Sequence, residues 1–153
     1  MTALVWFKRD LRCSDHAALS AALACGQPVC ALAVLEPRWL AQAETHPRQV
    51  GWWLHAALAL KQRLADRGIT LDLVEGDLPE VLDRLQRERP ITQRWTQLFS
   101  HEETGSGWTY DRDLAVAAWC RQHAVAWQEL PQNGVVRRLK DRSGWARRWQ
   151  ARM

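Results

Sequence analysis

The side chains best suited to chemistry gather in one short stretch, residues 8–16. This stretch contains three cations and two carboxylates: Lys8, Arg9, Asp10, Arg12 and Asp15. A guanidinium group presents paired, coplanar donors, so Arg9 and Arg12 could clamp an anionic or carbonyl-bearing ligand. Ion pairing within the loop and a helix cap would explain the same density of charge. From the residues alone, the stretch is either a ligand-binding loop or a turn tied by its own charges.

A second polar stretch, residues 100–107, combines His101 with Glu102, Glu103 and two glycines. Adjacent residues do not readily converge on one ion, so we expect no metal site there. The sequence contains neither GxGxxG nor GxxxxGK[ST], which argues against a nicotinamide dehydrogenase and against a P-loop enzyme. No elbow motif surrounds a serine or a cysteine, so a nucleophilic hydrolase is equally unsupported.

The four cysteines, at positions 13, 25, 30 and 120, form no CxxC pair. This spacing excludes a zinc ribbon or a disulfide framework as the organising principle, and the expected compartment is the reduced cytoplasm. The longest early apolar run, residues 3–7, is followed at once by charged residues and is too short for a signal peptide or a membrane span. We therefore expect a cytoplasmic protein with no membrane partner.

The net charge of +4 is concentrated at the C-terminal end. Residues 1–130 carry 14 Lys and Arg against 16 Asp and Glu, whereas residues 131–153 carry seven basic residues against Asp141 alone. The seven are Arg137, Arg138, Lys140, Arg142, Arg147, Arg148 and Arg152. A uniformly basic nucleic-acid-binding body is therefore disfavoured, and a DNA-contacting tail stays a hypothesis.

The chain has ten tryptophans, most of which we expect in the core or in interfaces. Trp145 and Trp149 lie four residues apart in the basic tail, where they form a stripe with Val135, Leu139 and Met153. Either a terminal helix docks this stripe on its own domain, or the stripe is a surface for a partner outside this chain.

Strand-like and helix-like periodicities alternate along residues 1–130. Apolar runs predict five strands, the last at a sheet edge, near residues 3–7, 29–35, 69–74, 93–99 and 125–129. Helical spacing predicts four helices: one capped by Asp15 and stopped by Gly26, one over 50–68, one from a cap at Asp77 through Leu85, and one from about Thr109 to His123. The core faces of the first two helices are expected to hold Ala18, Leu19, Ala22 and Leu23, and Val50, Trp53, Leu54, Ala57, Leu58 and Leu64.

This alternation predicts an α/β fold: a single domain with a doubly wound, Rossmann-like, five-stranded parallel sheet. Such sheets bind ligands at the carboxyl ends of their strands. The segments that follow the predicted strands are residues 8–14, 36–39, 75–77, 100–108 and 130–134.

Three sequence motifs resemble the N-terminal domain of DNA photolyases and cryptochromes. The opening Trp6-Phe7-Lys8-Arg9-Asp10-Leu11-Arg12, with Asp15-His16 and Ala18-Leu19, is similar to that family's first motif. Leu35-Glu36-Pro37 resembles the turn that ends its second strand. Trp108-Thr109-Tyr110-Asp111-Arg112-Asp113 resembles the stretch in which an RD pair opens a helix. The resemblance runs through essentially the whole chain.

The resemblance implies an α/β antenna domain over residues 1–130 and a basic helix or connector over residues 131–153 toward an absent helical domain that binds FAD. In the family, the antenna domain holds a pigment, which is a folate, a deazaflavin or a flavin, and passes excitation to FAD. Carried over residue by residue, the pigment site would use Arg9, Asp10, Leu11, Arg12, Glu36, Arg48, His101 and Glu102.

Two departures from the family pattern bear on the pigment. The folate-type loop often reads Asn-x-[EQ]-Tyr, where this chain has Ser100-His101-Glu102-Glu103, so a deazaflavin or flavin is favoured over methenyltetrahydrofolate. Glu36 stands where an aspartate is commoner and lengthens the side chain in the cleft.

The resemblance also implies that this chain alone is not catalytic. A full-length parent would be a photolyase, a carbon-carbon lyase of light-driven DNA repair, or a cryptochrome, and it would contact DNA mainly through its FAD domain. The alternative is a stand-alone nucleotide-binding module of the universal-stress-protein type, which rests on fold analogy.

Overall fold

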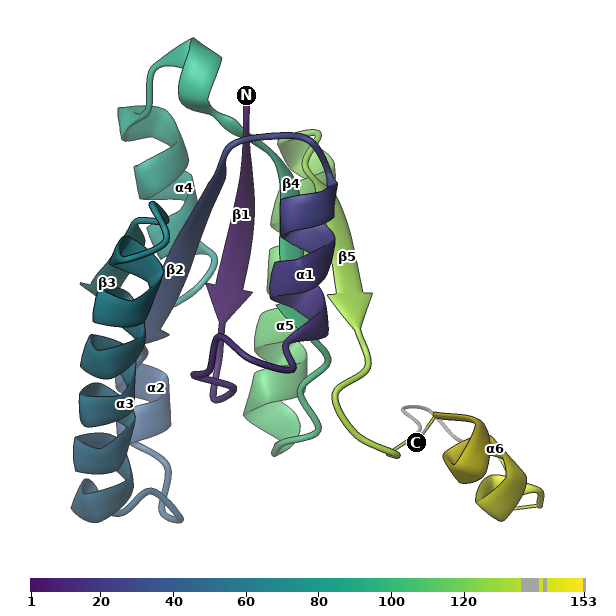
Figure 1. Cartoon of the computed structure of the whole chain (residues 1–153). Helices are drawn as coiled ribbons and strands as arrows, with labels where there is room; N and C mark the ends of the chain where they lie inside the picture. The colour runs from purple at the N-terminus through teal and green to yellow at the C-terminus, as the bar shows by residue number, and fades with distance from the viewer. Residues whose placement is uncertain (136–140, 142, 153) are drawn as a thin grey trace.

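The computed structural model describes residues 1–135, 141 and 143–152. The strands are β1 (Thr2–Phe7), β2 (Val29–Leu35), β3 (Leu71–Glu75), β4 (Trp95–His101) and β5 (Ala126–Leu130). The helices are α1 (Ala17–Ala24), α2 (Pro37–Leu40), α3 (Pro47–Ala65), α4 (Glu80–Glu88), α5 (Gly107–Gln122) and α6 (Trp145–Arg152), with a short 3-10 helix, η1 (Ile91–Gln93), before β4. Figure 1 shows the strands side by side with helices packed around them.

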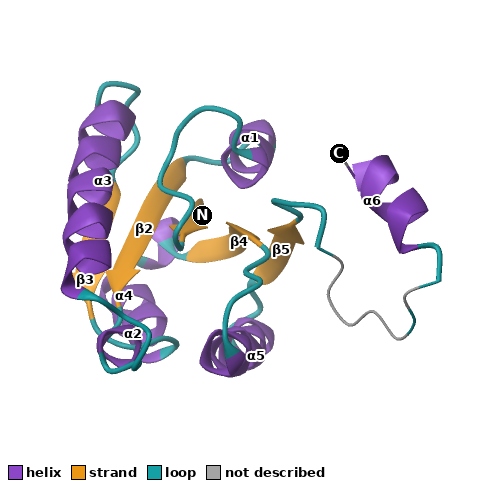
Figure 2. Ribbon diagram, turned by 90° about the horizontal axis from the view of Figure 1, so that it is seen from below, coloured by secondary structure: helices purple, strands orange, loops and turns teal. Residues whose placement is uncertain are grey.

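The five strands form one parallel sheet in the order β3-β2-β1-β4-β5. The chain moves outward from β1 through β2 to β3 and then returns past β1 to β4 and β5. With right-handed crossovers, this reversal places α1 and α3 on one face and α4 and α5 on the other, as Figure 2 shows. The predicted doubly wound, five-stranded sheet is confirmed, and β5 lies at an edge as predicted.

The central strand β1 is covered on both faces. Its alternate side chains Val5 and Phe7 join the core cluster under α1 and α3, whereas Leu4 and Trp6 join the cluster under α4 and α5. Burial on both faces explains the continuous apolar run in the sequence. The next residue in the same alternation is Lys8, so its charge is directed toward α5.

Two helix starts differ from the sequence prediction. His16, and not Asp15, caps α1, because its Nδ1 accepts a hydrogen bond from the Leu19 backbone N–H at 3.0 Å. Asp15 has a φ of +50°, a left-handed conformation that a helix cap does not use. Helix α4 begins without a side-chain cap, and the Asp77 carboxylate instead accepts a hydrogen bond from the Arg38 backbone N–H at 3.3 Å.

The predicted core faces of α1 and α3 are buried except at their margins. Leu23 and Leu58 were expected to face the core, but each is 56% exposed. The buried residues of α3 are Trp53, Ala57, Leu60 and Leu64. They follow one stripe at spacings of four, three and four residues, and Leu58 lies about 100° away from that stripe.

Helix α6 lies beyond the β5 edge of the sheet (Figures 1 and 2). Its Trp145 and Trp149 are 46% and 41% exposed, and their ring centroids are 6.4 Å apart. Trp149 packs against Gly134, where an added Cβ would collide with the indole. The remaining members of the predicted stripe and tail that lie outside the described residues are Leu139, Met153, Arg137, Arg138, Lys140 and Arg142. Within the described residues, no helix combines the length and apolar composition needed to cross a membrane.

Candidate functional site

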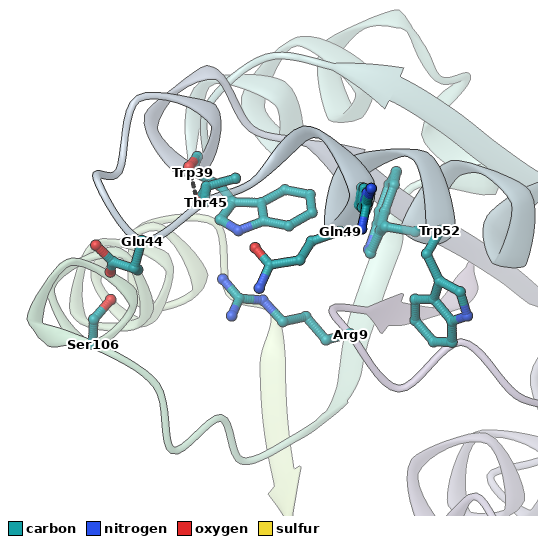
Figure 3. A pocket seen from close by; sticks show the side chains of 9 residues that line it. Arg9, Trp39, Glu44, Thr45, Gln49, Trp52 and Ser106 are labelled. Atoms are coloured by element: carbon teal, nitrogen blue, oxygen red, sulfur yellow. Dashed lines mark hydrogen bonds between the residues drawn. The ribbon is translucent and has the colours of Figure 1, made fainter.

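A cavity of about 630 Å³ opens beside the carboxyl ends of β1 and β2. It is bounded by the loop after β1, by α2 and by the first turns of α3, as Figure 3 shows. The lining residues are Arg9, Trp39, Glu44, Thr45, Arg48, Gln49, Trp52, Trp53 and Ser106. The cavity therefore combines three indoles with two guanidinium groups.

The start of α3 is fixed by a capping box. His46 Nδ1 accepts a hydrogen bond from the Arg48 backbone N–H at 3.2 Å, and the Gln49 side chain accepts one from the His46 backbone N–H at 2.9 Å. Thr45 Oγ1 donates a hydrogen bond to the Trp39 carbonyl at 2.7 Å and ties the connection to α2. These bonds satisfy the first N–H groups of the helix and hold the cavity wall in place.

The tryptophans differ in how firmly they are held. Trp53 is 3% exposed, and its Nε1 donates a hydrogen bond to the Lys8 carbonyl at 2.9 Å. Trp39 meets Trp53 edge-on, with centroids 6.0 Å apart and an interplanar angle of 62°. Trp52 is 66% exposed and lies at the opposite end of Figure 3 from Glu44. The inner wall of the cavity is thus held by the buried, hydrogen-bonded Trp53, and its outer edge carries the solvent-exposed indole of Trp52.

Beside this cavity, a buried triad joins three elements at the β1–β4 switch point. Asp10 Oδ2 lies 2.6 Å from His101 Nδ1 and 2.9 Å from His16 Nε2, and Asp10 Oδ1 accepts a hydrogen bond from the Lys8 backbone N–H at 2.8 Å. Burial alone would raise the pKa of Asp10, but the contacts with His101 and His16 outweigh it and hold that pKa well below its ordinary value. The carboxylate is therefore a fixed anion.

The same three residues are close enough to suggest a metal site, with candidate ligand atoms all within 4.8 Å of one another. The hydrogen-bond directions argue otherwise. His16 Nδ1 accepts the Leu19 N–H, so the proton of a neutral ring sits on Nε2, which faces Asp10. A protonated nitrogen cannot ligate a metal. The geometry favours a triad held by the hydrogen bond between His101 and Asp10, with His16 Nε2 2.9 Å from the same carboxylate oxygen but without hydrogen-bond geometry.

A second buried charge cluster lies between the sheet and α5. Arg112 binds three carboxylates, with distances of 2.7 Å to Glu36, 2.5 Å to Glu103 and 2.8 Å to Asp113. Lys8 Nζ lies 3.0 Å from Asp113 Oδ2 and 3.5 Å from Glu129 Oε1. The crevice that these groups share with Trp6 and Trp108 holds only about 10 Å³. The cluster fills this part of the sheet and leaves no room for a ligand.

Glu36 and Arg112 are the central pair of this cluster, and burial and neighbouring charges shift the pKa of each. Burial raises the pKa of Glu36 despite the opposing charge of Arg112. Burial alone would lower the pKa of Arg112, but Glu36, Glu103 and Asp113 together raise it above its ordinary value. Arg112 is thus the permanent cation of the cluster, and its carboxylate partners Asp113 and Glu103 also pair with Lys8 and Arg9.

The structure separates the eight predicted site residues into groups. Arg9 and Arg48 line the cavity, while Asp10 and His101 belong to the triad. Arg12 donates two hydrogen bonds to the Asp15 carbonyl, and so ties the turn. The other three are Leu11, which packs against the core under α1 and α3, Glu36, which pairs with Arg112, and Glu102, which lines a separate hollow of about 200 Å³ with His101.

Most of the cavity lining was missed by sequence reasoning. Glu44, Thr45, Gln49 and Trp52 come from the α2–α3 connection and the outer face of α3, and Trp53 was expected only in the core. Trp52 lies outside the predicted apolar stripe of its helix. A large apolar side chain in that position could have indicated a binding surface. The short helix α2, which places Trp39, gave no periodicity to detect.

The chain is similar to proteins of known family over most of its length. A family model described as DNA photolyase matches residues 3–142. Among curated proteins, a deoxyribodipyrimidine photo-lyase of Thermus thermophilus is 42% identical over 87 residues, which cover 54% of this chain and 20% of that protein. A cryptochrome DASH of Gloeobacter violaceus is 31% identical over 121 residues, which cover 76% of this chain and 24% of that protein.

Solved structures give the same likeness. A class III photolyase from Agrobacterium tumefaciens superposes with a TM-score of 0.76 at 26% identity, covering 94% of this chain and 28% of that one. A Synechocystis cryptochrome shares the fold, with a TM-score of 0.74 at 23% identity over 84% of this chain and 26% of that one. The chain spans about a fifth to a quarter of these relatives. The matches do not favour the universal-stress-protein alternative.

Proposed function

Because the chain belongs to the DNA photolyase family, we propose that residues 1–130 form an antenna domain whose cavity of about 630 Å³ holds a light-harvesting pigment. The observation that carries the proposal is the lining of that cavity. Indoles from Trp39, Trp52 and Trp53 offer faces and edges on which a planar ring can stack. The guanidinium groups of Arg9 and Arg48 can bind carbonyl or anionic groups on such a ring.

In this proposal the pigment absorbs near-ultraviolet or blue light and passes the excitation to FAD held by a helical domain. The residues of this chain bind and orient the pigment, and they make or break no bond. Residues 131–153 would lead toward the helical domain. Light-driven repair of DNA, with its carbon-carbon lyase chemistry, would belong to the longer protein.

A deazaflavin or a flavin suits the cavity better than methenyltetrahydrofolate. The loop that would hold a folate lacks the family's Asn-x-[EQ]-Tyr pattern, and its Glu102 borders a hollow of only about 200 Å³. The Trp-lined cavity is about three times larger and has an apolar inner wall. The absence of the folate pattern therefore favours a deazaflavin or a flavin, and the Trp-lined cavity is the larger of these two hollows.

Binding can be tested by titrating the chain separately with a deazaflavin, flavin mononucleotide and methenyltetrahydrofolate. Quenching of tryptophan fluorescence and a shift in pigment absorption report the complex. Trp52→Ala removes a solvent-exposed face of the cavity without opening the core, and we expect roughly tenfold weaker binding, the loss of about one stacking contact. Trp145→Ala, at an exposed tryptophan on α6, is the matched control and should bind as the unaltered chain does.

Two results would contradict the proposal. If none of the three pigments binds at concentrations that saturate known pigment sites, the chain is no antenna domain. If a pigment binds but Trp52→Ala and Trp145→Ala bind it equally well, the pigment lies elsewhere and the cavity assignment is wrong.

A further inference from the structure

The charged groups that line the cavity are unevenly placed. Arg9 and Arg48 supply two cations, and Glu44 supplies a carboxylate. Figure 3 shows Glu44 beside Ser106 at one end, whereas the Arg9 guanidinium lies in the middle, near Trp39 and Gln49. The cavity therefore has an acidic end and a basic region, and a ligand that carries one charged group would enter in one orientation.

Arg9 is held in place by Glu103, outside the cavity lining, and by Trp39 of the cavity wall. Its Nε lies 3.3 Å from Glu103 Oε1, and its guanidinium carbon is 5.2 Å from the centroid of the Trp39 ring. The side chain remains 48% exposed. Among the described residues, neither terminal nitrogen of Arg9 takes part in a hydrogen bond or an ion pair, so both can donate to a ligand.

Arg48 lines the cavity from a different element, the first turn of α3. Its backbone N–H is fixed by the capping box, through the 3.2 Å hydrogen bond to His46. Its side chain is exposed and makes no ion pair with any residue that the structure describes. The spacing of four residues also puts Arg48 and Trp52 on the same face of α3, so cation and indole flank the same opening.

We propose that the cavity selects a planar ligand that carries a phosphate, with the phosphate oxygens shared between Arg9 and Arg48. The inference rests on the proposed function and adds the charge of the ligand to it. A phosphate offers three acceptor oxygens and close to two negative charges, so two guanidinium forks from different elements can bind it at once. Glu44 repels the phosphate from the other end and leaves that end to uncharged donor groups of the ring.

Flavin mononucleotide and riboflavin provide the matched pair of ligands, because they share one ring and differ in the phosphate. We expect the chain to bind flavin mononucleotide at least about tenfold more tightly than riboflavin. Charge-assisted hydrogen bonds from two guanidinium groups to the phosphate account for a difference of this size. Raising the salt concentration should shrink this preference, since the site is partly exposed. Dissociation constants from fluorescence quenching give both values.

Arg48→Met should remove most of the preference for the phosphate, so that the ratio of the two dissociation constants falls toward one. Arg63→Met, at an exposed arginine in the last turn of the same helix, is the control and should keep the preference. Arg9→Met supplies a second, independent loss from the loop after β1. Circular dichroism of each variant verifies that the fold is kept.

The outcomes separate this inference from the proposed function. Equal affinities for flavin mononucleotide and riboflavin would overturn the inference and leave the pigment site standing. A preference that survives both Arg48→Met and Arg9→Met would also overturn it, because the phosphate would then lie elsewhere. Failure of both flavins to bind would overturn the inference, and failure of every pigment would overturn the proposed function as well.

Discussion

Replacing Asp10 with asparagine tests whether the buried triad holds the β1 loop to α1 and β4. The carboxylate accepts a hydrogen bond from the Lys8 backbone at 2.8 Å and lies 2.6 Å from His101 and 2.9 Å from His16. Asparagine keeps one acceptor oxygen but turns an N–H₂ group toward histidine donors. One bond to a charged acceptor is lost and one buried donor is left unpaired, so we expect a loss of about 2–4 kcal/mol.

That loss is a large share of the total stability of a domain, which is about 5–15 kcal/mol. For a chain of this length it corresponds to a fall in Tm of roughly 5–15 °C. Urea unfolding followed by tryptophan fluorescence at neutral pH measures the difference in free energy. Asp15→Asn, on the exposed part of the same loop, is the control and should stay within about 0.5 kcal/mol of the unaltered chain.

The pH dependence gives the same residue a second, independent test. The folded-state pKa of Asp10 is depressed, so its contribution to stability is complete above the ordinary aspartate pKa, near 4, and is lost as the pH falls below it. Stability of the unaltered chain should therefore fall between about pH 4 and pH 2, and that of Asp10→Asn should fall less steeply. An Asp10→Asn chain within about 0.5 kcal/mol of the unaltered one at pH 7 would refute the structural role assigned to the triad.

Three further outcomes follow from the buried groups and from the helices. Arg112→Met should cost more stability than Glu36→Gln, because it removes the cation shared by three carboxylates, whereas Arg112 keeps two partners when Glu36 is neutral; urea midpoints of the two variants decide this. Gly51→Ala should stabilise the chain by about 0.5–1 kcal/mol, since an added Cβ in the middle of α3 meets nothing within 4 Å, and a higher Tm would show it. Burial raises the pKa of Cys120 to about 12, so a thiol reagent at pH 8 should label Cys13 in the native chain and Cys120 only after unfolding.

The sheet could be predicted from the sequence because each of its strands leaves a local signal. A strand buried on both faces needs an uninterrupted apolar run, and residues 3–7 and 29–35 show one. Helix caps were harder to predict, because several residue types can accept a backbone N–H. His16 caps the helix in place of Asp15. This depends on the second contact of the histidine ring, with Asp10, which lies outside the helix.

The site was only partly predictable for a related reason. The charged loop after β1 was found from its composition, but composition does not say which charges turn inward. The alternation of β1 directs Lys8 to α5, buries Asp10 against two histidines and leaves Arg9 exposed at the cavity. Arg12 ties a turn, as one interpretation of this loop predicted, and Arg9 lines a cavity. That the loop binds a ligand stays a prediction.

The position of the cavity follows from how the switch point is filled. A doubly wound sheet opens a crevice between β1 and β4, and here the triad and the Arg112 cluster occupy it, leaving hollows of about 200 Å³ and 10 Å³. The larger cavity lies to one side, where α2, the α2–α3 connection and the start of α3 line it. Buried ion pairs contribute little net stability, but they fix geometry. Glu103 binds Arg112 with one oxygen and Arg9 with the other, so the charge cluster inside the sheet also sets the cation at the wall of the cavity.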